Sequence, residues 1–145
     1  MKHHAYAVIV IANHSPLPCN PKPLTIMLYR KENIILSKVD AFSDRIIRLG
    51  KYLKEEKHEQ ILRNQILRSG TSIAANTVES KNAQSRADFI GKLNIALKEA
   101  DETKKWIKKL YVGEYIDQRG FESLDRDVTE IIKILTAIVK TSKRL

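Results

Sequence analysis

The stretch Arg68-Ser-Gly-Thr-Ser-Ile-Ala-Ala-Asn-Thr-Val-Glu79 decides the fold that this sequence predicts. It continues a helical run that starts near Glu59, because no proline interrupts it, and it is rich in small side chains. Glycine and serine inside a helix cost up to about 1 kcal/mol each relative to alanine, so close packing must compensate for them. Small side chains let two helix axes approach to about 8 Å. The stretch therefore predicts the tightly packed central helix, residues 59–80, of an all-helical bundle.

Three further segments with helical periodicity supply neighbours for this helix. Apolar residues recur three or four positions apart in each of them, which is typical of one buried helix face. They span about residues 38–55, 85–112 and 121–139. Ser85 with Asp88 three residues later is a helix start signal. No proline occurs after residue 23, and the connections are short. The predicted fold is all-α, an antiparallel up-down-up-down four-helix bundle.

Length and composition indicate one basic domain. The chain has 145 residues, which suffice for one core and are too few for two. There are 26 lysines and arginines against 17 acidic residues, a formal charge of +9 that favours an anionic partner. Cys19 is the only cysteine, so no intramolecular disulfide and no cysteine-based zinc site can form. A reducing cytoplasm fits this composition best.

The first residues differ from the rest, and we divide the chain into an N-terminal extension, 1–26, and a bundle domain, 27–145. Residues 5–12 are eight consecutive apolar residues, too few to span a bilayer, so we expect no membrane partner. Three interpretations of the extension stay open. It is an upstream start with Met27 as the working initiator, a genuine flexible tail, or a weak secretion signal that lacks a usual cleavage site.

A resemblance to a known family rests on four segments: Leu67-Arg-Ser-Gly-Thr-Ser-Ile-Ala-Ala-Asn76 with Glu79, Asp88-Phe-Ile90, Ala96-Leu-Lys-Glu-Ala-Asp-Glu-Thr103, and Trp106. These segments resemble the four-helix bundle protein family, which is also called the 23S ribosomal RNA intervening-sequence protein family. The resemblance covers about Arg30 to Lys143. Ser80 departs from the pattern, because many members have glycine or alanine after the glutamate.

The resemblance implies an antiparallel four-helix bundle that assembles into a ring-like homopentamer. It also implies a bacterial protein encoded within an insertion in a 23S ribosomal RNA gene or elsewhere in the genome. A relative serves as a nucleic-acid-binding accessory to the reverse transcriptase of diversity-generating retroelements. The family implies no enzymatic activity. Second apolar flanks on the helices predicted at 85–112 and 121–139 independently predict a homo-oligomer.

A polar stripe follows the family motif on the helix predicted at 59–80. Its residues, with two glutamates expected opposite them, are Arg68, Ser69, Ser72, Asn76, Glu79, Glu99 and Glu102. The stripe either grips RNA or a subunit partner, or it fixes the register of two helices through hydrogen bonds, since buried polar groups need partners. We favour the second interpretation.

The sequence predicts no catalytic, metal or cofactor site. Helical bundles hold di-metal centres with Glu-x-x-His motifs, and that motif does not occur, although Glu99 and Glu102 form a carboxylate pair. His58 is the only histidine within the bundle domain. Glycine-rich phosphate loops and the Gly-x-Ser-x-Gly motif are also missing from the sequence. We therefore expect a non-enzymatic protein without a cofactor.

Charge is unequal between the two ends of the expected bundle. Antiparallel order brings residues 30–38, 81–86 and 140–144 together with a charge of +7, whereas residues 51–63 and 104–122 at the other end sum to +3. The candidate nucleic-acid-binding residues are Arg30, Lys31, Lys38, Lys81, Arg86, Lys140, Lys143 and Arg144. In a ring, these ends would hold phosphates without reading base sequence. Alternatively, the charge serves solubility and the helix dipole.

These patterns predict a homo-oligomeric bundle that binds structured RNA or DNA through phosphate contacts. The alternative is an oligomeric scaffold that recruits another protein and has no role with nucleic acid. The two differ in salt dependence, because phosphate binding weakens steeply with salt and a packed protein interface does not.

Overall fold

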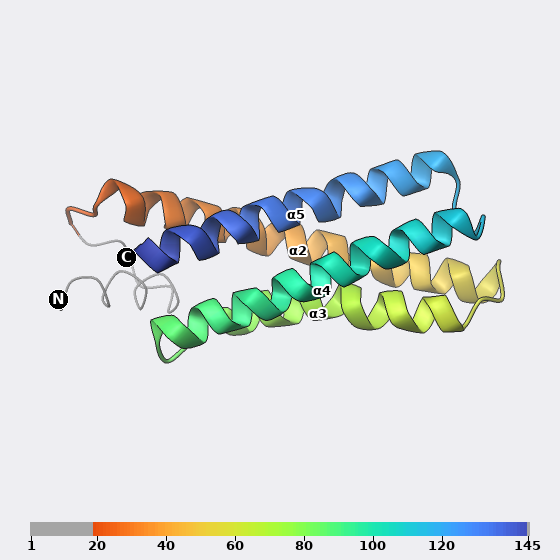
Figure 1. Cartoon of the computed structure of the whole chain (residues 1–145), viewed down its shortest axis with the longest axis horizontal. Coiled ribbons are helices and arrows are strands. Elements are labelled where there is room, and N and C mark those ends of the chain that lie inside the picture. Colours follow the sequence, from red (N-terminus) through yellow and green to blue (C-terminus); the bar gives the residue numbers. More distant parts are fainter. Residues whose placement is uncertain (1–18, 145) are drawn as a thin grey trace.

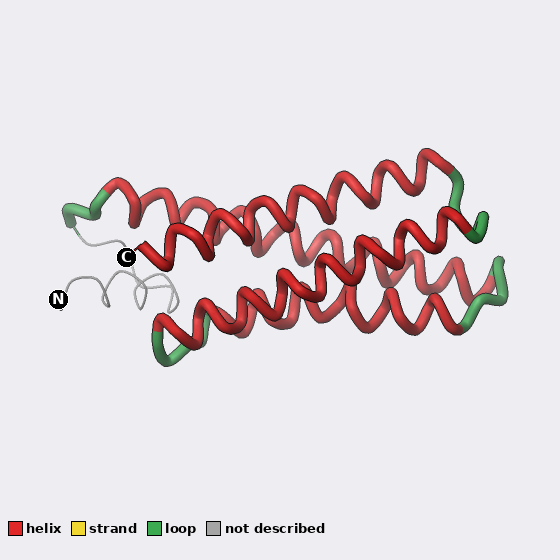
Figure 2. The backbone as a smooth tube through the Cα atoms, in the orientation of Figure 1, coloured by secondary structure: helices red, strands yellow, loops and turns green. Residues whose placement is uncertain are grey.

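The computed structural model describes residues 19–144, and these residues form four antiparallel helices. They are α2 (Pro23–Glu55), α3 (Ile61–Ser80), α4 (Arg86–Val112) and α5 (Gln118–Arg144). Each helix reverses the direction of the one before it (Figure 1), and the segments between helices within the described residues are loops (Figure 2). The predicted all-α antiparallel four-helix bundle is confirmed.

The helices form a closed square in which α2 packs on α3, α3 on α4, α4 on α5, and α5 on α2. Each of them contributes fully buried aliphatic or aromatic side chains to one core, among them Phe42, Ile46, Ile66, Ile73, Leu93, Ile107, Ile131 and Leu135. Full burial of such a side chain contributes about 1.5–3 kcal/mol. None of the helices within residues 19–144 is long and apolar enough to cross a membrane.

Close approach of α2 and α3 explains the small residues of α3. A Cβ atom added to Gly70 would lie 2.8 Å from Cγ2 of Ile46, and one added to Gly50 would lie 2.7 Å from Cδ2 of Leu67. The Arg63 Nε atom also donates to the Gly50 carbonyl at 3.0 Å. The predicted tight packing is present. However, α3 is a corner of the square, with extensive contacts to α2 and α4, and is not a central rod.

The first helix begins earlier than the pattern indicates, at Pro23 and not near residue 38. Proline at the first helical position loses no hydrogen bond, because that N–H has no partner within the helix. Thr25 and Leu28 are buried. The expected boundary after residue 26 therefore falls inside this helix. The expectations for residues 1–18 lie outside the described residues.

The other helix ends follow local capping chemistry. The Ser85 side chain accepts from the backbone N–H of Asp88 at 3.1 Å, so the predicted start signal of α4 is confirmed. The Asp117 carboxylate accepts from the N–H of Gly120 at 2.7 Å and starts α5 a few residues before the predicted position. His58 and Glu114, in the two connections at the opposite end, adopt left-handed backbone with φ of 54° and 61°.

Candidate functional site

At one end of the bundle α2 starts, α3 turns into α4, and α5 ends (Figure 1). Cationic residues from three segments of the sequence belong to this end. Lys81 follows the last residue of α3, and Arg86 is the first residue of α4. We call this end, with the residues that follow, the basic end. Its cations are Arg30, Lys31, Lys81, Arg86, Lys140, Lys143 and Arg144.

The C-terminal cations of this set are the most accessible. Lys140, Lys143 and Arg144 are exposed, whereas Arg86 is half-buried and donates from Nη2 to the Lys143 carbonyl at 3.4 Å. That bond ties the start of α4 to the end of α5 and satisfies one of the last carbonyls of the helix. The basic end is therefore held together by its own hydrogen bond, and the exposed charges of α5 face solvent.

Lys38 does not belong to the basic end, although the sequence grouped it there. Its Nζ atom forms an ion pair with Glu130 at 3.0 Å. At 1.5 Å per residue, it lies about 22 Å along α2 from Pro23. Like the neighbouring ion pair of Arg45 with Asp127, it connects α2 to α5. Lys38 is part of this connection and not of a cationic surface.

The only acidic residue counted within these segments, Glu32, is largely buried. Its Oε1 atom has no hydrogen-bond partner among residues 19–144. It lies beside a cavity of about 10 Å³, which is near the size that holds one water molecule. Burial raises the pKa of Glu32 to about 8, and the positive charge of Lys81 opposes that rise. The cavity walls include Tyr29, Thr77, Ser80, Phe89 and Leu93. The carboxyl is thus protonated over much of the neutral range, which leaves the basic end more positive.

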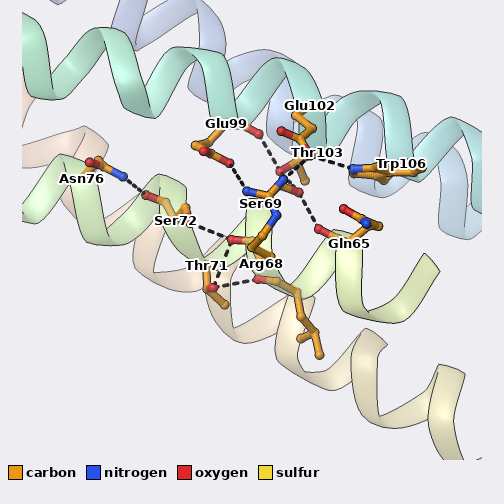
Figure 3. A network of polar contacts seen from close by, with 11 residues as sticks. Gln65, Arg68, Ser69, Thr71, Ser72, Asn76, Glu99, Glu102, Thr103 and Trp106 are labelled. Atoms are coloured by element: carbon orange, nitrogen blue, oxygen red, sulfur yellow. Dashed lines mark hydrogen bonds and ion pairs between the residues drawn. The ribbon is translucent and has the colours of Figure 1, made fainter. Parts of the chain in front are cut away.

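The polar stripe joins α3 to α4 through Arg68 (Figure 3). The guanidinium forms an ion pair with Glu99 at 3.3 Å and a second one with Glu102, which also accepts from Trp106 Nε1 at 3.1 Å. The hydrogen bond from Arg68 lowers the pKa of Glu102, and Trp106 lowers it further. The same pairing raises the pKa of Arg68. Both glutamates lie where the register interpretation expected them.

Ser69 makes a buried contact beneath this ion pair. Its Oγ atom accepts from Thr103 Oγ1 at 2.9 Å and donates to the Gln65 carbonyl at 3.1 Å (Figure 3). Both hydroxyl groups are fully buried, so their mutual bond removes a desolvation cost and fixes the register of α3 on α4.

The other stripe residues make different contacts. Ser72 donates to the Arg68 carbonyl at 2.7 Å, and Asn76 Nδ2 donates to the Ser72 carbonyl at 2.9 Å, both within α3. Glu79 pairs with Lys92 of α4 at 2.8 Å, a partner that the sequence interpretation missed. The stripe therefore serves the α3–α4 contact through Arg68, Ser69 and Glu79, while Ser72 and Asn76 bond back to their own helix.

Aromatic side chains gather at the opposite end, which we call the loop end, and the sequence interpretation missed them. Tyr52, Tyr111 and Tyr115 line a cavity of about 550 Å³ between the two connections. Tyr111 stacks on Phe121 with ring centroids 4.7 Å apart. A signal was present, since all four rings lie within the segments whose charges were summed for that end.

A metal ion would need three or more histidine, cysteine, aspartate or glutamate side chains close together. Residues 19–144 contain no such group. The carboxylate pair considered in the sequence, Glu99 and Glu102, faces Arg68 instead.

Comparisons with known proteins agree with the resemblance in the sequence. The model of the 23S rRNA-intervening sequence protein family matches residues 31–137. A solved structure from Bacteroides thetaiotaomicron VPI-5482, described as a protein of unknown function from the S23 ribosomal protein family, is 52% identical with a TM-score of 0.75. The match covers 76% of this chain and 98% of that chain. No curated protein matches.

Proposed function

The chain belongs to the 23S rRNA-intervening sequence protein family, and from this premise we propose that it binds structured RNA or DNA through phosphate contacts at its basic end. In this proposal the protein is cytoplasmic, has no enzymatic activity and uses no cofactor. A role beside a reverse transcriptase, which the family resemblance also implies, would use the same surface.

The exposed cations at the end of α5 are the observation that carries the proposal. Lys140, Lys143 and Arg144 project from the last turns of one helix, and Arg86 joins them from α4. Phosphate contacts of this kind release counterions and give affinity without base specificity. The helix dipole alone would favour such cations at a C-terminus. It does not account for Arg30, Lys31, Lys81 and Arg86, which come from the other helices.

Homo-oligomerisation is part of the proposal, and the family resemblance implies five subunits. Exposed apolar side chains on the outer surface support it, since Ile47, Val78 and Ile95 are each about half exposed, at 53%, 49% and 45%. Covering such residues in a subunit contact would remove apolar area from water. Multi-angle light scattering of the full chain should give a mass well above the monomer. A stable monomer at micromolar concentration would contradict this part.

Salt dependence tests the binding mode. We expect a gel shift of an RNA hairpin or a DNA duplex by the full chain at about 50 mM salt that weakens steeply toward about 200 mM. The triple variant Lys140→Glu/Lys143→Glu/Arg144→Glu should bind about 100-fold more weakly, because three contacts are lost and replaced by repulsion. Its salt slope should fall by about 2.7.

A matched variant controls for net charge. Lys98, Arg126 and Lys133 are exposed and belong to the middle stretches of α4 and α5. Changing these three residues to glutamate alters the net charge by the same amount. The proposal expects the control variant to keep most of its affinity. Equal losses in both triple variants, or no shift of any hairpin or duplex at low salt, would sink it.

A protein-interaction scaffold is the alternative, and the same exposed apolar residues favour it. A ring of bundles would then recruit another protein, and the basic end would only maintain solubility. A complex of this kind should survive the salt range that dissociates a phosphate contact.

A further inference from the structure

The cavity at the loop end is a wide depression that is open to solvent. Its volume of about 550 Å³ is within the range of about 300–1,000 Å³ that small-molecule sites occupy. Its lining residues belong to the α2–α3 and α4–α5 connections and to the helix ends beside them. Both connections lie at the same end of the bundle (Figure 1). Its walls carry three kinds of chemistry, aromatic, acidic and basic, from Tyr52, Lys57, Tyr111, Glu114, Tyr115 and Asp117.

The aromatic walls are held in place. Tyr115 donates its hydroxyl to Glu59 Oε2 at 3.0 Å, and Glu59 also accepts from the backbone N–H of Leu62 at 2.9 Å. The ring of Tyr111 lines the cavity and stacks on Phe121, which does not line it. Fixed aromatic rings are stacking platforms for nucleobases.

The acidic wall offers one uncommitted carboxylate. Asp117 uses Oδ1 to cap α5, but the side chain of Glu114 makes no hydrogen bond or ion pair with the described part of the chain. Glu114 lies between Tyr111 and Tyr115, and its backbone N–H donates to the Tyr111 carbonyl at 3.0 Å. A carboxylate accepts two parallel hydrogen bonds. Among the RNA bases, guanine has the matching pair of adjacent donors on its Watson–Crick edge, N1–H and the N2 amino group.

The cavity wall carries both signs of charge, with Lys57 beside Glu114 and Asp117. Residues 51–63 and 104–122 carry nine basic and six acidic groups, so this end is positive despite Glu114 and Asp117. Lys57 lines the cavity, and its Nζ atom lies 5.8 Å from the centre of the Tyr52 ring. A bare cation would leave Lys57 unused, and a bare phosphate would leave the rings and Glu114 unused. A base that carries a phosphate matches all three walls.

We propose that the loop-end cavity binds an unpaired guanine nucleotide of an RNA strand. The base stacks on Tyr111, its Watson–Crick edge donates to Glu114, and its phosphate lies near Lys57. The inference deepens the proposed function, because it rests on RNA binding, and it assigns a second site at the opposite end of the bundle. The basic end would hold the backbone of a stem, and the loop end would hold a base outside it.

Free nucleotides test the chemistry of the site. In a titration followed by the amide signals of Gly113 and Gly120, guanosine monophosphate should bind at least about tenfold more tightly than the adenosine, cytidine or uridine monophosphates. Inosine monophosphate lacks the N2 amino group and should lose much of that preference. Equal affinities for all four nucleotides, or no shift with guanosine monophosphate at millimolar concentration, would overturn the proposal.

Two variants at the cavity and one control assign the roles. Glu114→Gln should remove the preference for guanine, whereas Glu122→Gln, an exposed glutamate that does not line the cavity, should not. Tyr111→Leu should weaken all four nucleotides about tenfold. Because Tyr111 packs on Phe121, circular dichroism must show that this variant folds. Tyr111→Phe, which keeps the aromatic ring, should bind all four nucleotides as the parent does. Retained preference in Glu114→Gln, or equal losses in Glu114→Gln and Glu122→Gln, would overturn the assignment.

Two further experiments complete the test. One asks whether the guanine belongs to an RNA strand or to a free nucleotide, and the other asks whether the two ends bind independently. A single-stranded RNA hexamer with one guanine should bind more tightly than the free nucleotide, because flanking phosphates meet the surrounding lysines. Tighter binding of the free nucleotide would overturn the RNA assignment. The Lys140→Glu/Lys143→Glu/Arg144→Glu variant should bind guanosine monophosphate unchanged. A loss of nucleotide binding in that variant would overturn the separation of the two ends.

Discussion

The basic end and the loop end are both positive, yet they are built differently. At the basic end, flexible cations project from helix termini, and the single acid counted with them, Glu32, is buried with a pKa raised to about 8. At the loop end, nine basic groups stand beside six acidic ones, and stacked or hydrogen-bonded rings line a cavity. This difference teaches that the net charge of an end does not by itself predict which ligand that end can bind. The first end suits a phosphate backbone, and the second suits a base.

The largest expected effect is a double dissociation between the ends. Reversing charge at Lys140, Lys143 and Arg144 should cost about 100-fold in hairpin affinity and leave guanosine monophosphate binding unchanged. Glu114→Gln should have the opposite pattern. It should reduce the preference for guanosine monophosphate by about tenfold or more, and it should leave the affinity for a hairpin without loop guanines almost unchanged. Parallel gel shifts and nucleotide titrations check this. If each variant weakens both ligands equally, the ends are one site and the comparison fails.

The pH dependence of stability should come from the basic end. Burial raises the pKa of the Glu32 carboxyl from its ordinary value of 4.5 to about 8 in the folded chain. The folded state therefore retains a proton that the unfolded state releases. The contribution of Glu32 to the free energy of unfolding is therefore largest below about pH 4.5. It falls as the pH rises toward 8 and then levels off. A loss of about 2 kcal/mol between pH 5 and pH 8 is expected after allowance for partial exposure.

Thermal unfolding of a matched pair of variants measures this effect. Glu32→Gln should flatten the dependence between pH 5 and pH 8 and raise the melting temperature at pH 8, because no charge is then buried. Glu55→Gln, an exposed glutamate at the loop end, should keep the profile of the parent. A Glu32→Gln variant with the same pH profile as the parent would show that Glu32 ionises freely.

Much of the fold follows from the sequence, because the decisive signals are local. The small residues at 69–75 predicted a close helix contact, and Ser85 with Asp88 predicted the start of α4. The start of α2 could not be found by the same means. The prolines at 16–23 indicated a break, whereas the last of them occupies the first helical position, where proline is tolerated.

Only part of the candidate site could be predicted from the order of the helices. Summing charges by segment placed Arg86 and Lys143 at one end, where they are joined by a hydrogen bond, but it also included Lys38, which pairs with Glu130. The charge sum also treated Glu32 as a surface charge. Its burial depends on tertiary packing, which a sum over sequence segments does not include. The aromatic cavity could not be found from a local pattern, because its tyrosines come from two segments that only the fold brings together.

The smallest expected effect concerns the close packing of α2 on α3, the two helices that run between the basic end and the loop end. Gly70→Ala should destabilise the bundle by about 1–2 kcal/mol, because the added methyl group meets Ile46 at 2.8 Å. Gly91→Ala is the matched control on α4, where an added Cβ has no atom within 4 Å, and it should stabilise by up to about 1 kcal/mol. Urea unfolding measures both. A stabilised Gly70→Ala variant would mean that α2 and α3 are less closely packed.

The central claim is that the basic end holds the nucleic-acid backbone, and mapping amide chemical shifts of the full chain on binding an RNA hairpin tests it most directly. The account predicts that the largest changes fall at residues 81–86 and 140–144, with a second group near Glu114 only when the hairpin carries an unpaired guanine. Changes confined to the middle of the helices, or none at residues 81–86 and 140–144 while the hairpin is bound, would contradict it.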